Sequence, residues 1–457
     1  MKILLIYPRF KYPSGQPPLG LGSIISFLKM KLPDLSIDVY DATFETENNK
    51  NISSYDFSQY TLIGFSVMTT MAGDAHEMAA LIKSKDQSAK IIFGGPHPTV
   101  LPELCMSDPH VDMVIQGEGE EAFYELLINL DSPAKVANLI YRENGQIISN
   151  ERRSTYTDID SLPAPDRSHF NMSEYIKIWN SMDTVSPNLT GTSLIISRGC
   201  PYNCSFCQPT LTNLFGKKIR KRAPENIIEE LHLLKKRYSI NAFMFEDDTF
   251  MIDKVWAERI CSLLIESEMN FRWCCNLRAD NIDAALLEKM YAAGLRKINI
   301  GMESSSDRLL GTVYNKKIST KQIIEAVNIA KKLKLKVQGY FILGHPSETL
   351  DDLQETIRFA CKLPIDDVSF SILTPFPGTH LYASEKKLLS GQFTDFDYYR
   401  ACNYSPEHMN VLPRKIEQLK SQAYLKFYTR PQRLLQQVSI LLHKNGLKKI
   451  FTKIKRI

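Results

Sequence analysis

Short apolar runs alternate with amphipathic stretches over roughly the first 130 residues. The runs that predict buried strands are residues 3–7, 37–40, 62–67, 91–93 and 113–115. Between them, stretches such as 21–30 and 75–85 repeat apolar residues at helical spacing. Continuous apolar strands separated by helices are typical of a parallel sheet that is covered on both faces. We therefore predict an α/β, Rossmann-like first domain at residues 1–135.

The pattern weakens between residues 136 and 190, which we expect to link two domains. Residues 140–148 predict a hairpin around Asn144-Gly145. Residues 161–166 (Ser-Leu-Pro-Ala-Pro-Asp) read as a proline-rich crossing segment.

A second alternation of strands and helices begins at about residue 191. Strand candidates are residues 194–197, 242–246, 273–277, 297–301, 337–343 and 368–373. Helical patterns fall at 224–238, 254–267, 284–293, 320–333 and 349–362. Six successive βα units predict a partial (β/α)6 barrel over residues 191–385, shorter than the closed eight-fold form. Barrel enzymes keep their chemistry at the carboxyl ends of the strands, so we look for functional residues there.

The C-terminal region, residues 386–457, is expected to be short and mostly helical. From Lys444 to Ile457 there are six basic residues and no acidic one, and apolar residues interleave with them at roughly helical spacing. Such a segment more often packs its apolar face on its own protein. It can also lie on an anionic membrane surface, so peripheral membrane contact stays open.

Composition adds only broad limits. A chain of 457 residues with 44% hydrophobic content fits a globular protein of two or three domains. No apolar run reaches the eighteen or so residues of a transmembrane helix, and the apolar start is too short for a signal peptide. The net charge of +5 is modest, so we expect no nucleic-acid partner. Free thiols predict a reducing, cytoplasmic location.

Three of the nine cysteines, Cys200, Cys204 and Cys207, lie in one segment with the spacing C-x3-C-x2-C. An odd cluster at this spacing cannot pair fully in disulfides, and no second pair or nearby histidine suggests a zinc site. Thiolates are suited to iron–sulfur clusters. Three of them can hold a 4Fe–4S cube and leave the fourth iron open to a substrate or cofactor. The other cysteines are expected to be small core residues: Cys105, Cys261, Cys274, Cys275, Cys361 and Cys402.

Polar groups or glycines recur in order at the other predicted strand ends. They are Glu246, Asp247, Arg278, Glu303 and Gly344. Together with the cysteine motif, this layout resembles the radical S-adenosylmethionine (SAM) superfamily, in which the open iron chelates the amino and carboxylate groups of SAM.

The resemblance implies a role for each of these residues. Glu246 or Asp247 would help to bind the methionyl amine, and Phe206 would pack near the adenine. The stretch 339–348, with Gly344, would also lie near the adenine. Arg278 and Glu303 would contact the ribose or the methionyl carboxylate. A carboxylate at a strand end can also cap a helix, so Asp247 or Asp248 could do that instead.

The first domain carries a second series of motifs. Residues 63–66 read Ile-Gly-Phe-Ser, residues 94–99 read Gly-Gly-Pro-His-Pro-Thr, and residues 117–120 read Gly-Glu-Gly-Glu. In this order they resemble the cobalamin-binding domain of cobalamin-dependent radical SAM proteins. The resemblance implies that the domain binds cobalamin through these residues: Ser66, Gly94, Gly95, Gly117 and Gly119.

One common cobalamin motif is missing. The sequence D-x-H-x-x-G, whose histidine ligates cobalt in many cobalamin enzymes, is absent, and Asp74-Ala75-His76 does not fit it. We expect His97 to be a hydrogen-bonding loop residue rather than a cobalt ligand. The alternative is a degenerate Rossmann-like domain that binds nothing.

The resemblance implies a radical SAM enzyme with a 4Fe–4S cluster, SAM and cobalamin as cofactors. It would make a 5′-deoxyadenosyl radical and methylate an unactivated carbon through methylcobalamin, with both cofactors facing one cavity. Alternatives are a radical cyclase, a carbon–carbon coupling enzyme, or an iron–sulfur redox or binding protein. The expected partners are a small-molecule, lipid or peptide substrate and an electron donor such as flavodoxin or ferredoxin.

Overall fold

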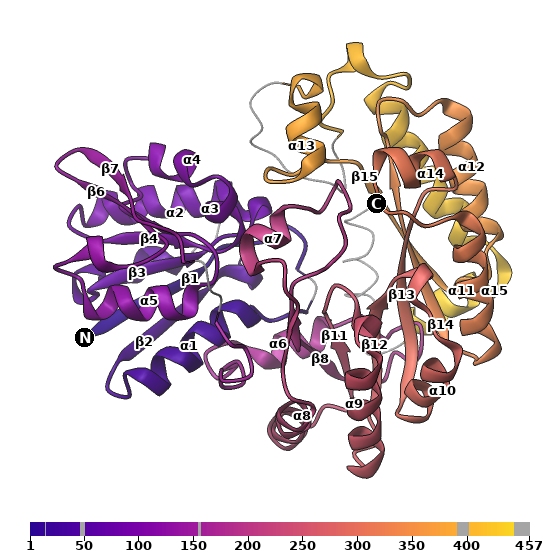
Figure 1. Ribbon diagram of the computed structural model, residues 1–457, viewed down its shortest axis with the longest axis horizontal. Helices are drawn as coiled ribbons and strands as arrows, with labels where there is room; N and C mark the ends of the chain where they lie inside the picture. The colour runs from indigo at the N-terminus through magenta and orange to yellow at the C-terminus, as the bar shows by residue number, and fades with distance from the viewer. Residues whose placement is uncertain (14, 46–50, 154–156, 391–401, 443–457) are drawn as a thin grey trace. The chain divides into compact units, whose positions relative to one another are not determined.

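The computed structural model describes residues 1–13, 15–45, 51–153, 157–390 and 402–442 (Figure 1). These residues form two compact units. Unit 1 comprises residues 1–13, 17–172 and 208–220, and unit 2 comprises the rest. The basic segment 444–457 lies outside the described residues. Within them, no helix has the length and apolar character needed to cross a membrane.

Unit 1 is built on a seven-stranded sheet with the order β2-β1-β3-β4-β5-β6-β7. The strands are β1 (Lys2–Tyr7), β2 (Ser36–Asp41), β3 (Leu62–Ser66), β4 (Ile91–Gly94), β5 (Met113–Ile115), β6 (Leu139–Glu143) and β7 (Gln146–Ser149). The first five are parallel, and the last two form the predicted hairpin, antiparallel to β5. The hairpin joins the sheet because its apolar residues Leu139, Ile140 and Tyr141 are buried beside β5. Part of the segment expected to be a linker therefore belongs to unit 1.

Helices cover both faces of this sheet. They are α1 (Leu19–Lys31), α2 (Ala72–Lys85), α3 (Pro96–Val100), α4 (Pro102–Ser107) and α5 (Gly119–Ile128), and the short helix α7 (Thr210–Phe215) packs on α3. Helices α2 and α4 contribute Met78 and Cys105 to a core that contains Phe65. On the other face, Phe123 of α5 lies beside Gly64. The order β2-β1-β3-β4 reverses direction between β1 and β3, and ligands of such sheets bind outside the carboxyl ends of the strands at this point.

Unit 2 contains a six-stranded parallel sheet with the order β15-β14-β13-β12-β11-β8. The strands are β8 (Gly191–Leu194), β11 (Ala242–Phe245), β12 (Arg272–Leu277), β13 (Leu295–Glu303), β14 (Lys336–Leu343) and β15 (Asp367–Ile372). Each strand lies beside its neighbour along the chain, as a half-barrel requires, and the helices pack along its outer side (Figure 1). The predicted partial (β/α)6 barrel is therefore confirmed.

The first strand of this sheet ends earlier than the sequence pattern predicts. The N–H of Glu246 donates to the carbonyl of Leu194. Two residues later, the N–H of Ile196 donates to the side-chain carboxylate of Asp247 (3.2 Å) rather than to a backbone carbonyl of a neighbouring strand. The predicted strand at 194–197 is therefore mostly the start of the cysteine loop.

The helices of unit 2 are those expected, with a few more. They are α6 (Met172–Ile178), α8 (Pro224–Tyr238), α9 (Lys254–Glu266), α10 (Ala284–Ala292), α11 (Thr320–Lys332), α12 (Leu350–Lys362), α13 (His380–Glu385), α14 (Pro413–Tyr428) and α15 (Pro431–Leu441). Two-residue strands lie at β9 (Ser197–Arg198) and β10 (Arg220–Lys221). Helix α14 docks on β15, where the N–H of Phe370 donates to the Tyr424 hydroxyl (2.9 Å). The described C-terminal region is thus largely helical, as expected.

Candidate functional site

The three cysteines of the motif lie in the loop that follows β8. Gly199 has a φ of +99°, a left-handed conformation that turns the chain into the motif. Within the loop, the N–H of Cys207 donates to the carbonyl of Cys204 (3.1 Å). Burial, together with Asp248 and Cys204, raises the pKa of Cys200 to about 11. Burial and the two other cysteines likewise raise the pKa of Cys207. All three thiols stand in one short loop, and iron bound there would replace their protons.

Unit 2 fixes the cysteine loop from the side of residues 313–316. The N–H of Ser205 donates to the carbonyl of Tyr314 (2.9 Å), and Asn315 donates to the carbonyl of Asn203 (2.8 Å). Phe206 packs its ring edge-on against Tyr314, with 5.6 Å between the ring centres. The rest of Phe206 is partly exposed. Residues 313–316 run from the end of a short π-helix (Leu309–Val313) into a loop, and no motif or periodicity in the sequence marks them.

Arg278, at the end of β12, contacts the cysteine loop directly. Its Nη1 lies 3.5 Å from the sulfur of Cys204, and its guanidinium lies 3.6 Å from the ring centre of Tyr202. Asp280 accepts two hydrogen bonds from it (3.0 Å each), and the Lys316 carbonyl accepts another (2.7 Å). Of the five guanidinium protons, these contacts leave one for a ligand. Arg278 therefore places a positive charge beside the sulfur of Cys204.

Glu303 ends β13 in a left-handed conformation, with a φ of +59°. Its carboxylate accepts a hydrogen bond from Lys316 at 2.6 Å, and Lys316 also donates to the carbonyl of Gly301 (2.8 Å). Both side chains are less than one-tenth exposed. Burial of two charges requires such pairing. Lys316 is a site residue that sequence reasoning missed.

Glu246 and Asp247 follow β11, and Asp247 contacts the beginning of the cysteine loop. Glu246 accepts hydrogen bonds from Ser193 (2.6 Å) and Gln16. Asp247 accepts from the N–H of Ile196 and from the Ser197 hydroxyl. Burial raises the pKa of Glu246 and lifts that of Asp247 to about 7.

The alternative role of a helix cap does not apply to Asp247. The next helix, α9, is capped by Asp253, whose carboxylate accepts from the N–H of Trp256 (3.1 Å). Asp247 instead holds the beginning of the cysteine loop.

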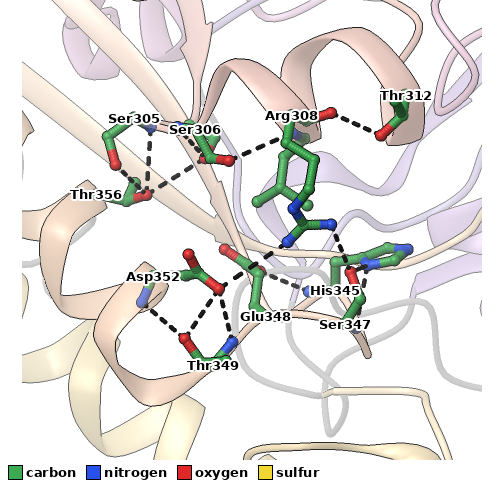
Figure 2. A network of polar contacts seen from close by, with 12 residues as sticks. Ser305, Ser306, Arg308, Thr312, His345, Ser347, Glu348, Thr349, Asp352 and Thr356 are labelled. Atoms are coloured by element: carbon green, nitrogen blue, oxygen red, sulfur yellow. Dashed lines mark hydrogen bonds and ion pairs between the residues drawn. The ribbon is translucent and has the colours of Figure 1, made fainter.

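The loop after β14 turns at Gly344, whose φ is +102°. Figure 2 shows the polar network that follows it, in which one carboxylate oxygen of Glu348 accepts from the N–H groups of Gly344 and His345 (2.7 Å each). Burial raises the pKa of Glu348 to about 7. Arg308 reaches across to Ser347, at 3.3 Å. Glu348 within the loop and Arg308 outside it therefore hold the loop. A Cβ added at Gly344 would lie 3.2 Å from the side chain of Ile416.

The inner face of the half-barrel carries a row of amides. Asn276 and Asn299 pair in register on β12 and β13, and Asn299 pairs with Gln338 on β14. Asn299 donates to Asn276 (3.1 Å), and Lys297 donates to Gln338 (2.7 Å). An open half-barrel cannot fill its inner face with apolar layers as a closed barrel does. We call Asn276, Asn299 and Gln338 the amide row.

In unit 1, glycine turns form the carboxyl ends of the strands. After β4, Gly95 has a φ of +102°, and an added Cβ would lie 3.0 Å from the carbonyl oxygen of Val67. After β5, Gly117 has a φ of +78°. Thr99 ties the two turns together, since its hydroxyl donates to Gly95 (2.7 Å) and accepts from the N–H of Gly117 (2.8 Å). Glycine adopts such left-handed turns without strain, and the absence of a Cβ allows close approach to the backbone at Gly95 and Gly117.

The remaining predicted cobalamin contacts lie at the same strand ends. Ser66 is the last residue of β3, and Gly94 is the last of β4. Gly119 begins α5, where a Cβ would lie 3.1 Å from the side chain of Ile24. A pocket next to these positions is lined by Gln116, Gly117, Glu118, Glu121, Asn138, Arg152, Arg153 and Thr157. The structure thus brings all five predicted residues to one edge of the sheet, and they fit a cofactor bound through backbone contacts.

The prediction that His97 is a hydrogen-bonding loop residue is wrong in two respects, because the residue lies in α3 and its ring makes no hydrogen bond. Its backbone N–H donates to the carbonyl of Val67 (3.1 Å), but neither ring nitrogen has a hydrogen-bond partner. The side chain is directed into the fold, where the residue is 2% exposed, rather than across the loop. Nδ1 of His76, in α2, lies 2.5 Å from a carboxylate oxygen of Asp108.

Comparisons with known proteins match both units. The model of the radical SAM superfamily matches residues 194–360, and that of the B12 binding domain matches residues 11–127. An uncharacterized methyltransferase of Pyrococcus horikoshii is 33% identical over 96% of this chain and 95% of its own length. An anaerobic magnesium-protoporphyrin IX monomethyl ester cyclase of Rubrivivax gelatinosus is 24% identical over 84% of this chain and 69% of its own.

A solved structure shares the fold. It is the cobalamin-dependent SAM radical enzyme OxsB with aqua-cobalamin and SAM bound, which aligns with a TM-score of 0.75 at 19% identity, over 99% of this chain and 70% of its own. The protein belongs to the family of cobalamin-dependent radical SAM enzymes. The predicted cofactors, a 4Fe–4S cluster, SAM and cobalamin, are confirmed at the level of the family.

Proposed function

We propose that the protein transfers a methyl group to an unactivated carbon of a small molecule. One observation carries the proposal. A single chain combines a radical SAM domain with a B12 binding domain and resembles a methyltransferase over nearly its whole length. When bound, the cluster supplies the electron that cleaves SAM to a 5′-deoxyadenosyl radical, and cobalamin supplies the methyl group.

The cysteine loop is proposed to hold the cluster. Cys200, Cys204 and Cys207 would each donate a thiolate, and no fourth protein thiol follows in the motif. Arg278 supports this role, because its side chain touches the Cys204 sulfur and is itself fixed by Asp280. We propose Arg278 as a positioning residue first, with its remaining proton free for the methionyl carboxylate.

The neighbouring strand ends are proposed to hold SAM. Glu246 and Asp247 are carboxylates with raised pKa values, and an ammonium group beside them would favour their ionised forms. The partly exposed ring of Phe206 offers an apolar surface for the adenine. The N–H groups near Gly344 are already used by Glu348, so Gly344 would contribute close approach rather than hydrogen bonds. Glu303 is paired with Lys316 and would reach SAM only as part of that pair.

In unit 1, we propose that Ser66, Gly94, Gly95, Gly117 and Gly119 contact cobalamin. The positive φ angles at Gly95 and Gly117 support backbone contact with the corrin ring. No side chain of a D-x-H-x-x-G motif is available as a lower cobalt ligand.

The amide row supports a polar substrate. Asn276, Asn299 and Gln338 carry donors and acceptors on the inner face of the half-barrel, and Asn299 Oδ1 has no hydrogen-bond partner. A substrate with hydroxyl, amide or phosphate groups would satisfy such atoms. A flavodoxin- or ferredoxin-like donor would reduce the cluster. All nine cysteines are free, which supports a reducing compartment such as the cytoplasm.

The products of SAM test the proposal. The full chain, loaded with cluster and cobalamin and supplied with reductant, SAM and substrate, should form 5′-deoxyadenosine and S-adenosylhomocysteine in near-equal amounts. One SAM is cleaved to the radical and a second provides the methyl group. The variant with Cys200, Cys204 and Cys207 replaced by alanine should form no 5′-deoxyadenosine.

A cyclase is the second candidate, favoured by the likeness to the magnesium-protoporphyrin cyclase. In that case 5′-deoxyadenosine forms without S-adenosylhomocysteine. If neither product forms, the chain is a redox or binding protein with an inert cluster.

A further inference from the structure

Three potential metal ligands gather in unit 1, apart from the cysteine loop. They are His76 in α2, His97 in α3 and Cys105 in α4. One ligand atom from each lies within 4.8 Å of the others. Among the residues that the structure describes, this is the one such group of three. Because three separate helices supply it, chain proximity alone does not account for the grouping.

The unpartnered ring of His97 indicates that this group binds a ligand such as an ion. The residue is 2% exposed, and neither of its ring nitrogens has a hydrogen-bond partner. Buried polar side chains in native proteins nearly always have one, and each exception calls for an explanation such as an ion. Cys105 is fully buried beside it. A buried imidazole without a hydrogen-bond partner therefore lies in the same group as a buried thiol.

His76 is oriented as metal-binding histidines are. Its Nδ1 lies 2.5 Å from a carboxylate oxygen of Asp108, whose other oxygen lies 2.7 Å from Nδ1 of His110. An imidazole that donates its Nδ1 proton to a carboxylate carries its lone pair on Nε2, and this carboxylate–histidine arrangement is common behind zinc. The His76 side chain is 28% exposed, which gives an ion and a water molecule access from that side.

We propose that His76, His97 and Cys105 bind one zinc ion, with Asp108 orienting His76 and water as the fourth ligand. Two imidazoles and one thiolate form a ligand set that zinc accepts in tetrahedral geometry. Tetrahedral zinc places such atoms roughly 3.4–3.6 Å apart. Because the three atoms lie within 4.8 Å of one another, each pair would have to close by at most about 1.4 Å. On binding, the Cys105 thiol releases its proton to solvent, and no electron is transferred.

Such an ion would fasten α2, α3 and α4 to one another. His97 belongs to the turn that begins at Gly94-Gly95, so zinc would fix the position of that turn at the end of β4. The proposal does not depend on methyl transfer, since the group lies within unit 1 and uses none of the cluster cysteines.

Zinc binding to the full chain tests the site. The background is the triple variant Cys200→Ala, Cys204→Ala and Cys207→Ala, because an empty cluster loop can itself take up zinc. With zinc alone as the probe, metal analysis after gel filtration should give one zinc per chain. X-ray absorption should show one sulfur and two nitrogen neighbours from protein.

Single changes in this background should weaken binding in a defined order. Cys105→Ser and His97→Gln should each lower zinc affinity at least a hundredfold, measured against a chromophoric chelator. Asp108→Asn should lower it about 10- to 100-fold, as for other outer carboxylates. The matched control is Cys361→Ser, since Cys361 is 1% exposed but lies in unit 2, and it should leave affinity unchanged.

Two results would overturn the proposal. One is a background protein that retains no zinc, and the other is equal zinc affinity in Cys105→Ser. Circular dichroism identifies a variant that has unfolded, and the X-ray absorption spectrum of the background protein then decides alone. If His97→Gln loses corrinoid but keeps zinc, His97 is a cobalamin contact instead. Failure of methyl transfer would leave zinc binding intact.

Discussion

The two parallel sheets of this protein prepare their strand ends in different ways. In unit 2 the ends carry thiols, an arginine and carboxylates, and most of these groups already have partners, as Arg278 has Cys204 and Asp280. In unit 1 the ends carry glycine turns tied together by Thr99. The first arrangement suits a metal cluster and a small zwitterion, which are held by charge and ligation. The second suits a large ring that contacts backbone.

The largest expected effect is the loss of the iron–sulfur cluster from the cysteine loop of unit 2. Replacing Cys200, Cys204 and Cys207 with alanine should abolish cluster iron and its visible absorbance, while the protein keeps its corrinoid. Cys361→Ala is the control, because it removes a buried cysteine from the same unit. Iron analysis and absorbance spectra check the result. A triple variant with unchanged iron would contradict the assignment of the cluster.

The next effect concerns the buried ion pair behind the strand ends of unit 2. Lys316→Met leaves the Glu303 carboxylate buried without its partner, and we expect a loss of about 3–5 kcal/mol in the free energy of unfolding. Arg259→Met breaks an ion pair in which both side chains are about half exposed, and should cost less than about 1 kcal/mol. Denaturant titration of both variants measures the difference. Equal losses would show that the pair does not support the site.

The dependence of stability on pH tests the raised pKa of Glu348. Its pKa of about 7 in the folded protein lies above the ordinary value of 4.5, because the protonated form is favoured by burial. Protonated Glu348 therefore contributes about 3 kcal/mol to the free energy of unfolding below about pH 4.5. This contribution is lost as the pH rises to about 7.

The variant Glu348→Gln should lack this slope, because an amide oxygen can accept the same two N–H groups but does not titrate. Denaturation midpoints of both proteins at about pH 5, 6, 7 and 8 measure it. Parallel profiles would mean that Glu348 is ionised in the folded protein across this range.

The smallest expected effect concerns corrinoid binding at the glycine turns of unit 1. Gly95→Ala forces a side chain into a φ of +102° with its Cβ 3.0 Å from the Val67 oxygen, and should weaken corrinoid retention about tenfold, as strain of 1–3 kcal/mol implies. Iron content should not change. Gly73→Ala, in the open first turn of α2, is the control and should retain corrinoid fully. Full retention of corrinoid by Gly95→Ala would contradict the proposed backbone contact.

The sequence predicts most of the fold because both units consist of regular βα repeats. Helix α8 has the predicted bounds, residues 224–238, since Pro224 begins it and its apolar spacing is regular. The cysteine loop and the charged strand ends could be found in the same way, by type and order. Lys316 and Asp280 were missed as site partners, because no motif or helical spacing marks their contacts. Thr99 stands in the motif at 94–99, but its hydrogen bonds to both glycine turns could not be predicted. The group around His97 could not be foreseen, since three helices bring it together.

The fate of the SAM methyl group tests the central claim most directly. The protein with cluster and cobalamin is incubated anaerobically with reductant, SAM carrying a deuterated methyl group, and a small-molecule extract of its source cells. We predict that the intact labelled methyl group appears on a carbon of a product, while 5′-deoxyadenosine and S-adenosylhomocysteine accumulate together. Accumulation of 5′-deoxyadenosine with all label left in SAM and methionine would contradict methyl transfer.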